Sequence, residues 1–268
     1  MKKTAHSGIS ANDASTTLPK MIAISSGKGG VGKTNIAANL GYALSRLGKK
    51  ILIMDTDLGL GNLDVLLGIT PKYNMSHVIS GEKAFADIMV DGPGNMKILP
   101  ASSGIHGLTH LTSSQMDLIS EQMLHIVASF DAVLIDTAAG ISSNVLYFNA
   151  SAQDVYIVVT PDLTAITDAY ALIKVLSIQC GVSGFRLLVN QVENAKEARE
   201  IFRHLELVTG QFLDVSIDFM GHILKDDNMS KGIRSQKMVS DMFPKSPASE
   251  CFKVVARRIY DTMSHQAH

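Results

Sequence analysis

The sequence predicts a single three-layer α/β domain, with a mostly parallel sheet between two layers of helices. Short apolar runs alternate with helical patterns along the chain, which is the signature of a parallel sheet with helices on both faces. The runs are continuous rather than alternating, as expected for strands that are buried on both faces. Hydrophobic residues make up 46% of the chain and charged residues 18%, enough apolar material for a large core.

Residues 1–20 are polar and show no periodicity, so we expect a flexible arm, followed by one domain over residues 21–268. The start Met1-Lys2-Lys3 leads into no apolar segment of a signal peptide. No apolar run approaches the ~20 residues that cross a bilayer, so any membrane contact is expected to be peripheral.

The strands and helices follow in alternation. We expect strands at Met21–Ser25, Ile51–Asp55, Lys97–Leu99, Ala132–Asp136, Val155–Thr160 and Arg186–Asn190, and one more within Val215–Leu224. We expect helices at Lys33–Leu47, Ser113–Phe130, Thr164–Gln179, Ala195–Thr209 and Ser246–Met263. Gly48 suits the position after the first helix, where a left-handed residue ends many helices. Pro247 suits the first turn of the last helix.

A glycine-rich loop between the first strand and the first helix predicts phosphate binding. Eight residues match the pattern G-x-x-x-x-G-K-[ST]: Gly27, Lys28, Gly29, Gly30, Val31, Gly32, Lys33 and Thr34. Glycines allow backbone N–H groups to surround phosphate oxygens at a helix N-terminus. Lys33 would bind the β- and γ-phosphates and Thr34 would bind Mg²⁺. We therefore expect Mg-ATP here; the alternative is a structural glycine turn.

Acidic residues end two of the predicted strands. Asp55 and Asp57 follow one strand, and Asp136 follows another in the order of four apolar residues and then Asp. Ligands of open α/β sheets lie at the carboxyl ends of the strands, so these carboxylates are expected to face the nucleotide. Asp136 would hold Mg²⁺, and Gly140 would allow the loop after it to move. The alternative for Asp55 and Asp57 is capping of the next turn.

The loop, with its second lysine Lys28, resembles the deviant Walker A motif of the MinD/ParA superfamily of P-loop ATPases. The resemblance implies an ATP-dependent sandwich dimer in which Lys28 reaches the partner's nucleotide. It also implies that Asp57 positions the attacking water and that Asp55 supports the switch and the surroundings of the metal. Asn190 would read the adenine edge, beside a second base-contacting loop around Leu224, where the family often has proline.

Three segments resemble the FlhG (FleN) branch of that superfamily, the flagellar-number ATPases. They are Asp57–Gly68, Met75–Gly81 and Ile98–Gly104. Asn35, which we count with the nucleotide-binding residues, also fits this branch, because division-site MinD proteins usually carry a second threonine there. The resemblance covers roughly residues 20–260.

The FlhG resemblance implies a weak, switch-type ATPase in the cytoplasm that limits how many flagella form or where they assemble. Recruitment to the inner face of the membrane or to the cell pole is an open alternative. The implied partners are an FlhF-type GTPase, flagellar switch proteins or a flagellar transcription activator. FlhF activation uses an Asp-Gln-Ala motif in the arm. Asn12-Asp13-Ala14 lacks the glutamine, so a tag-like arm is an equal alternative.

The charge balance and the cysteine content help to distinguish the flagellar ATPases from other classes of the superfamily. Lys and Arg number 24 against 25 Asp and Glu, which leaves no electrostatic footprint for nucleic acid. The alternative function is a MinD/ParA-type positioning ATPase or a DNA-partitioning ATPase. Cys180 and Cys251 are too isolated for a disulfide framework, a zinc site or an iron–sulfur carrier. A tyrosine autokinase would need a terminal cluster beyond Tyr260, and a scaffold without turnover would not need Asp57 and Asp136.

The last predicted helix is amphipathic, and two interpretations of it are open. Phe252, Val255 and Ile259 lie along one side, while Arg257 and Arg258 lie on another. Such a helix could lie on an anionic membrane, as in MinD-like proteins. We favour a core-packing helix with a solvated basic face.

Overall fold

A single twisted sheet organises the molecule, which is described here by a computed structural model covering residues 19–102 and 110–264. Within these residues the sheet has eight strands in the order β3-β4-β2-β5-β1-β6-β7-β8. Neighbouring strands are parallel except β3 and β4, which are antiparallel at one edge. The strands are β1 (Lys20–Ser26), β2 (Ile51–Asp55), β3 (Val90–Asp91), β4 (Lys97–Leu99), β5 (Ala132–Ala139), β6 (Asp154–Val159), β7 (Gly184–Val192) and β8 (Ser216–Leu224).

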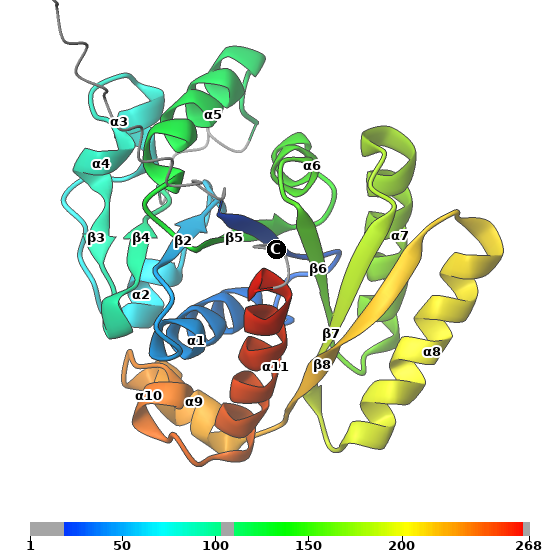
Figure 1. Cartoon of the computed structure of the whole chain (residues 1–268). Coiled ribbons are helices and arrows are strands. Elements are labelled where there is room, and N and C mark those ends of the chain that lie inside the picture. The colour runs from blue at the N-terminus through cyan, green and yellow to red at the C-terminus, as the bar shows by residue number, and fades with distance from the viewer. Residues whose placement is uncertain (1–18, 103–109, 265–268) are drawn as a thin grey trace, which may run out of the picture.

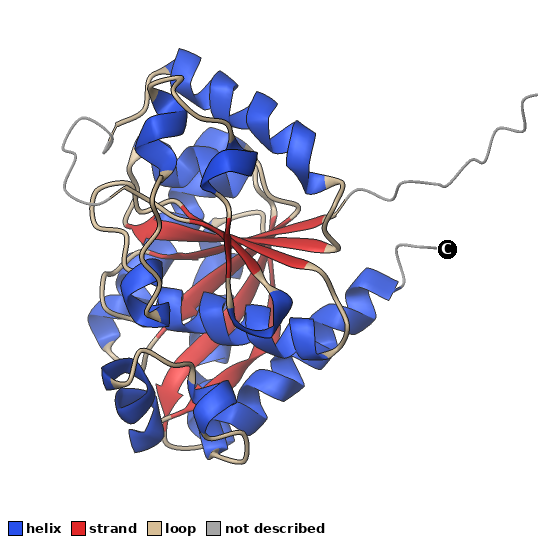
Figure 2. Ribbon diagram, turned by 90° about the vertical axis from the view of Figure 1, so that its left-hand side faces the viewer, coloured by secondary structure: helices blue, strands red, loops and turns tan. Residues whose placement is uncertain are grey.

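Helices cover both faces of this sheet (Figures 1 and 2), so the predicted three-layer fold is confirmed. One face packs against α1 (Lys33–Arg46), α2 (Leu63–Leu67), α9 (Asp227–Arg234), α10 (Val239–Met242) and α11 (Pro247–Ser264). The other packs against α3 (Met75–Ile79), α4 (Phe85–Ile88), α5 (Ser113–Val127), α6 (Ser143–Ala150), α7 (Leu163–Cys180) and α8 (Ala195–Phe212). A short 3-10 turn, η1 (Pro93–Asn95), precedes β4.

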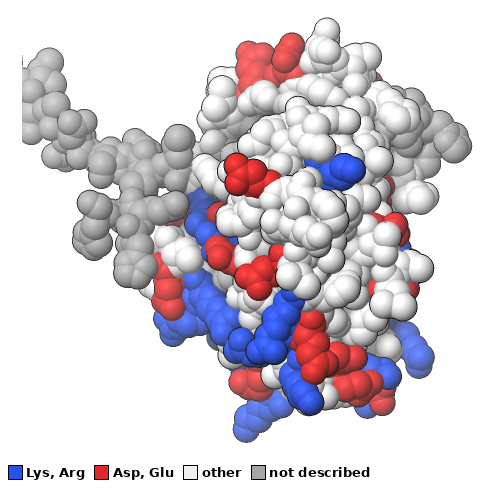
Figure 3. Space-filling view, turned by 90° about the vertical axis from the view of Figure 1, so that its right-hand side faces the viewer, with Lys and Arg blue, Asp and Glu red and all other residues white. Residues whose placement is uncertain are grey.

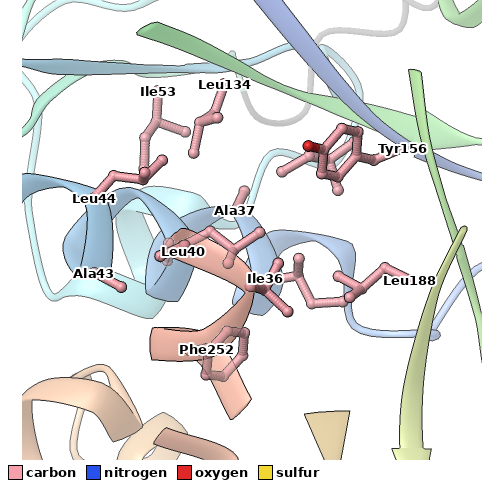
Figure 4. Packing of buried hydrophobic residues seen from close by; sticks show 14 of the residues in the cluster. Ile36, Ala37, Leu40, Ala43, Leu44, Ile53, Leu134, Tyr156, Leu188 and Phe252 are labelled. Carbon is pink, nitrogen blue, oxygen red and sulfur yellow. The ribbon is translucent and has the colours of Figure 1, made fainter. Parts of the chain in front are cut away.

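The core follows from the two-residue period of the buried strands. In β2, Ile51 and Ile53 pack toward α1, whereas Leu52 and Met54 pack toward the helices of the opposite face. Helix α1 lies at the centre of its layer, and Figure 4 shows its Leu44 next to Ile53 and its Ile36 above the α11 residue Phe252. Because α1 is buried along much of its length, its N-terminus and the loop before it are held firmly against the sheet.

Helix α11 is a core helix. Phe252, Val255 and Ile259 are at most 1% exposed and belong to the same cluster as α1. This confirms the core-packing interpretation of the last helix; peripheral membrane contact stays a prediction. Helix α7 is long and apolar enough to cross a bilayer by length and composition alone, but one face of it packs on the sheet, as a core helix does.

The predicted strands and the five long helices are confirmed, with ends that differ by up to three residues. The prediction that β5 ends at Asp136 was wrong, because the strand continues through Ala139. Lys20 was also wrongly placed in the arm: it begins β1, is 6% exposed and forms an ion pair with Asp154. Residues 1–18, which include Asn12-Asp13-Ala14, lie outside the described residues. Sequence reasoning missed the short elements α2, α3, α4, β3, α6, α9 and α10.

Candidate nucleotide-binding site

The glycine-rich loop connects the carboxyl end of β1 to the first turn of α1, as expected. Two of its glycines are left-handed, Gly30 at φ 79° and Gly32 at φ 95°, a conformation that side chains disfavour. Gly27 instead makes a close approach, because a Cβ there would lie 2.0 Å from the backbone oxygen of Asp168 in α7. The loop is therefore shaped by its own glycines and by the helix packed beneath its first residue.

Lys33 is buried at the start of α1, with its ammonium directed back under the loop. Its Nζ donates to Ser26 Oγ at 2.8 Å, and Ser26 Oγ donates in turn to the carbonyl of Lys28 at 2.7 Å. Burial lowers the pKa of Lys33, and the nearby carboxylates of Asp136 and Asp57 partly offset this. The site thus holds a cation that has lost much of its water, where an anionic ligand would interact strongly.

Two buried carboxylates lie side by side at the ends of β2 and β5, where Asp55 pairs with Asp136 in the strand register. Asp55 Oδ1 accepts the N–H of Asp57 at 3.0 Å, and Asp55 Oδ2 accepts the N–H of Leu63 at 3.3 Å. Burial, together with the charge of Asp136, raises the pKa of Asp55. Asp55 therefore closes the loop between β2 and α2.

Asp136 is the carboxylate that fits a metal ion. Burial raises its pKa to about 6, against the lowering effects of the Thr34 hydroxyl and the Lys33 charge. Its Oδ1 is buried with no hydrogen-bond partner among the described residues. Buried carboxylate oxygens are rarely left unpaired, and a carboxylate beside a threonine hydroxyl is the oxygen donor set that Mg²⁺ prefers. The residues present therefore fit Mg²⁺.

Lys28 is bound to its own chain in this structure. Its Nζ contacts Asp162 Oδ2 and lies 2.5 Å from Thr164 Oγ1, and both partners belong to the start of α7. The hydrogen bond from Lys28 lowers the pKa of Asp162 to about 2, helped by hydrogen bonds from Thr164. Both side chains of the ion pair are partly exposed, at 38% and 45%, so the pair can separate at low cost.

Three cavities surround the loop. One of about 480 Å³ is lined by Lys33, Thr34, Asp57 and α2, and another of about 440 Å³ by Lys28 and Asp162. A third, of about 250 Å³, is lined by Asn35, Asn190 and the start of α9. Asn190 is 4% exposed, and its Nδ2 donates to the carbonyl of Val31 at 2.7 Å. The side chain predicted to read adenine therefore also holds the loop.

The structure thus brings every residue predicted for the site to one edge of the sheet, the carboxyl ends of β1, β2, β5 and β7. Sequence reasoning missed Ser26, Asp162, Thr164 and Gln236. Ser26 could have been found as the hydroxyl directly before the loop, and Asp162 as a helix N-cap, since its side chain accepts the N–H of Thr164. Gln236 carries no recognisable pattern.

Comparison with known proteins agrees with this geometry. Residues 19–198 match the family model described as AAA domain. The chain is 42% identical over 240 residues to the antiactivator FleN of Pseudomonas aeruginosa, a match that covers 90% of this chain and 86% of that protein. It is 32% identical to the flagellum site-determining protein YlxH of Helicobacter pylori, covering 88% of this chain and 80% of that protein.

Solved structures of cell-division ATPases share the fold. MinD of Pyrococcus furiosus superposes with a TM-score of 0.76 at 23% identity, covering 91% of this chain and all of that one. MinD of Aquifex aeolicus, solved in a complex with MinC, has a TM-score of 0.72 at 27% identity, covering 90% of this chain and 96% of that one.

Proposed function

Because the chain belongs to the MinD-like P-loop ATPases, in the branch of the flagellar regulators FleN and YlxH, we propose that it is an ATP-driven switch that sets the number or placement of flagella. The observation that carries the switch chemistry is the convergence of Lys33, Thr34 and Asp57 on one cavity beside the unpaired Asp136 oxygen. These groups are suited to phosphate, to a divalent cation and to the placement of a water molecule.

ATP would lie along the loop, with its phosphates on the backbone N–H groups and on Lys33. Thr34 and Asp136 would hold Mg²⁺, which neutralises charge on the β- and γ-phosphates when bound. Asp57, whose Oδ1 accepts the N–H of Leu60 at 3.2 Å, would orient the attacking water. Asn190 lies beside the 250 Å³ cavity and would contact the base there.

ATP would also bring two copies of the chain together. Lys28 would leave Asp162 and bind the γ-phosphate in the partner copy, exchanging one anionic partner for a more highly charged one. Three large apolar side chains are exposed next to loops of the site: Leu60 at 73%, Ile141 at 52% and Leu163 at 78%. Burial of these side chains would favour a face-to-face dimer. ATP hydrolysis in such a switch would be slow, because it serves only to reset the protein to its ATP-free state.

The ATP-bound form would be read by a partner from the flagellar machinery: an FlhF-type GTPase, a switch-complex protein or a transcription activator. We place the protein in the cytoplasm, with recruitment to the membrane or cell pole through such a partner. DNA partitioning, the alternative, requires a cationic surface. On the side of the molecule that carries α7 and α8, Lys and Arg gather in the lower half with Asp and Glu beside them (Figure 3), as in the exposed pair Lys225–Glu193. Together with the balanced totals of 24 basic and 25 acidic residues, this favours a protein partner.

Complementation tests the proposed function. Cells of Pseudomonas aeruginosa that lack FleN would be supplied with the parent chain or with Lys33→Ala, and flagella per cell would be counted by electron microscopy. We expect the parent to lower the number of flagella and Lys33→Ala to leave it unchanged at equal protein level. Equal restoration by both would show that nucleotide binding is not the signal. No restoration by a parent that binds ATP would contradict the flagellar assignment.

A further inference from the structure

Gln236 joins two elements that are distant in sequence. It lies between α9 and α10, and its Nε2 donates to the carbonyl of Val65 in α2 at 3.1 Å, across 171 residues. Both residues line the 480 Å³ cavity that contains Lys33, Thr34 and Asp57. Helix α2 has only five residues and is too short to be stable by itself. Its Leu63, Leu66 and Leu67 pack in the core cluster that also holds α1, and the exposed Gln236 adds a hydrogen bond to this packing.

The two residues that face each other at this contact, Gln236 and Gly68, both have a left-handed backbone. Gln236 has a φ of 52°, a left-handed conformation that residues other than glycine and asparagine rarely adopt. Opposite it, Gly68 has a φ of 64°, and a Cβ at Gly68 would lie 3.2 Å from Gln236 Cβ. A glycine or asparagine would suit the backbone of residue 236 better. Gln236 adopts this conformation and its amide reaches the carbonyl of Val65.

Helix α2 is held at its other end by the site itself. Asp55 Oδ2 accepts the N–H of Leu63, the first residue of α2, and Asp55 Oδ1 accepts the N–H of Asp57. The loop that carries Asp57 is thus bound to the carboxylate of Asp55 at both ends, through the N–H groups of Asp57 and Leu63. Within this loop the N–H of Leu60 donates to Asp57 Oδ1 at 3.2 Å, so a shift of α2 that moves Leu60 would also move the carboxylate of Asp57.

We propose that Gln236 is a positioning residue for hydrolysis, which fixes α2 through the carbonyl of Val65 and thereby sets the position of Asp57. This rests on the proposed ATPase function. Its effect is on the chemical step, because a displacement of about 1 Å in a positioned group can cost up to about 100-fold in rate while binding is kept. The hydrogen bonds of Lys33 to Ser26 and of Asn190 to Val31, which hold the phosphate loop, do not involve α2, so ATP affinity is expected to stay the same.

Two substitutions separate this role from a role in folding. Gln236→Asn keeps the amide and suits the left-handed backbone, but it is one methylene too short to reach Val65. Gln236→Met keeps the length and adds no charge to the cavity, but it cannot donate to a carbonyl. Ser235→Ala, at an exposed neighbour whose side chain makes no contact in the described structure, is the control. Each variant would be assayed for kcat, for the Kd of a fluorescent ATP analogue and for thermal stability.

We expect both Gln236 variants to lower kcat by about tenfold, with Kd changed less than about twofold and Gln236→Asn melting no lower than the parent. Ser235→Ala should match the parent in all three. An unchanged kcat in both variants would overturn the proposal. An equal rise in Kd would also overturn it, because Gln236 would then contact the nucleotide directly. A parent that fails to hydrolyse ATP would instead contradict the proposed function, so the two failures are distinguishable.

Discussion

Replacing Lys33 by alanine is expected to lower ATP turnover by about 100- to 1,000-fold, the usual cost of removing one preorganised charge from a reacting group. Lys33 is 9% exposed, is held by Ser26 and lies near Asp136 and Asp57. Its charge would therefore act on phosphate through little water, and among the described residues no other lysine or arginine lines the cavity that holds Thr34 and Asp57. Arginine would not restore the rate, since its larger planar head does not fit a position shaped by Ser26.

The measurement is phosphate release at saturating Mg-ATP. Lys50→Ala serves as the control, because Lys50 is exposed just before the start of β2, away from the carboxyl ends that carry the site. The control should keep the parent rate. A Lys33→Ala variant that retained more than about a tenth of the parent rate would show that the phosphates lie elsewhere.

Replacing Asp136 by asparagine is expected to have two opposite effects: a more stable apoprotein and a much slower enzyme. Burial raises the pKa of Asp136 from its ordinary 3.8 to about 6, so the folded state binds a proton more tightly than the unfolded chain. At pH 7.5 the group is ionised in both states, and the folded protein bears the cost of a buried charge. A difference of this size corresponds to about 3 kcal/mol at most.

The sign of the pH dependence follows. The parent should lose this stability as the pH rises from about 4 to above 6, whereas asparagine is neutral throughout. Urea unfolding without nucleotide should therefore show Asp136→Asn more stable by up to about 3 kcal/mol at pH 7.5 and nearly equal to the parent at pH 4. Turnover with Mg-ATP should fall by about 100-fold, because a metal ligand is lost. Asp214→Asn, at an exposed position, should change neither. A destabilised Asp136→Asn at pH 7.5 would contradict the account of this carboxylate.

These two residues were identifiable from the sequence because their roles depend on local pattern. The loop from Gly27 to Thr34 and the acid after four apolar residues at Asp136 are each defined within a few positions of the chain. The parallel sheet followed in the same way from continuous apolar runs. Boundaries were less certain: β5 continues to Ala139 because Thr137 is buried and hydrogen-bonded to Ser25 and Ile24, which no apolar run reveals.

The parts that could not be predicted depend on contacts between distant segments. The ion pair of Lys28 with Asp162 spans 134 residues, and the hydrogen bond of Gln236 to Val65 spans 171. The short helices α2, α3 and α4 have four or five residues each, too few for a helical period to be visible. Their positions are set by packing under the sheet edge and by caps such as Asn74, not by their own propensity.

The most direct test of the switch is the oligomeric state of Asp57→Ala, measured by light scattering behind size exclusion with Mg-ATP or Mg-ADP. Loss of Asp57, the residue proposed to position water, should block hydrolysis and hold the ATP-bound form. We expect a dimer with ATP, a monomer with ADP, and a monomer again when Lys28→Ala is added to the same chain. A variant that binds ATP and stays monomeric would contradict the account, because Lys28 would then have no partner nucleotide to reach.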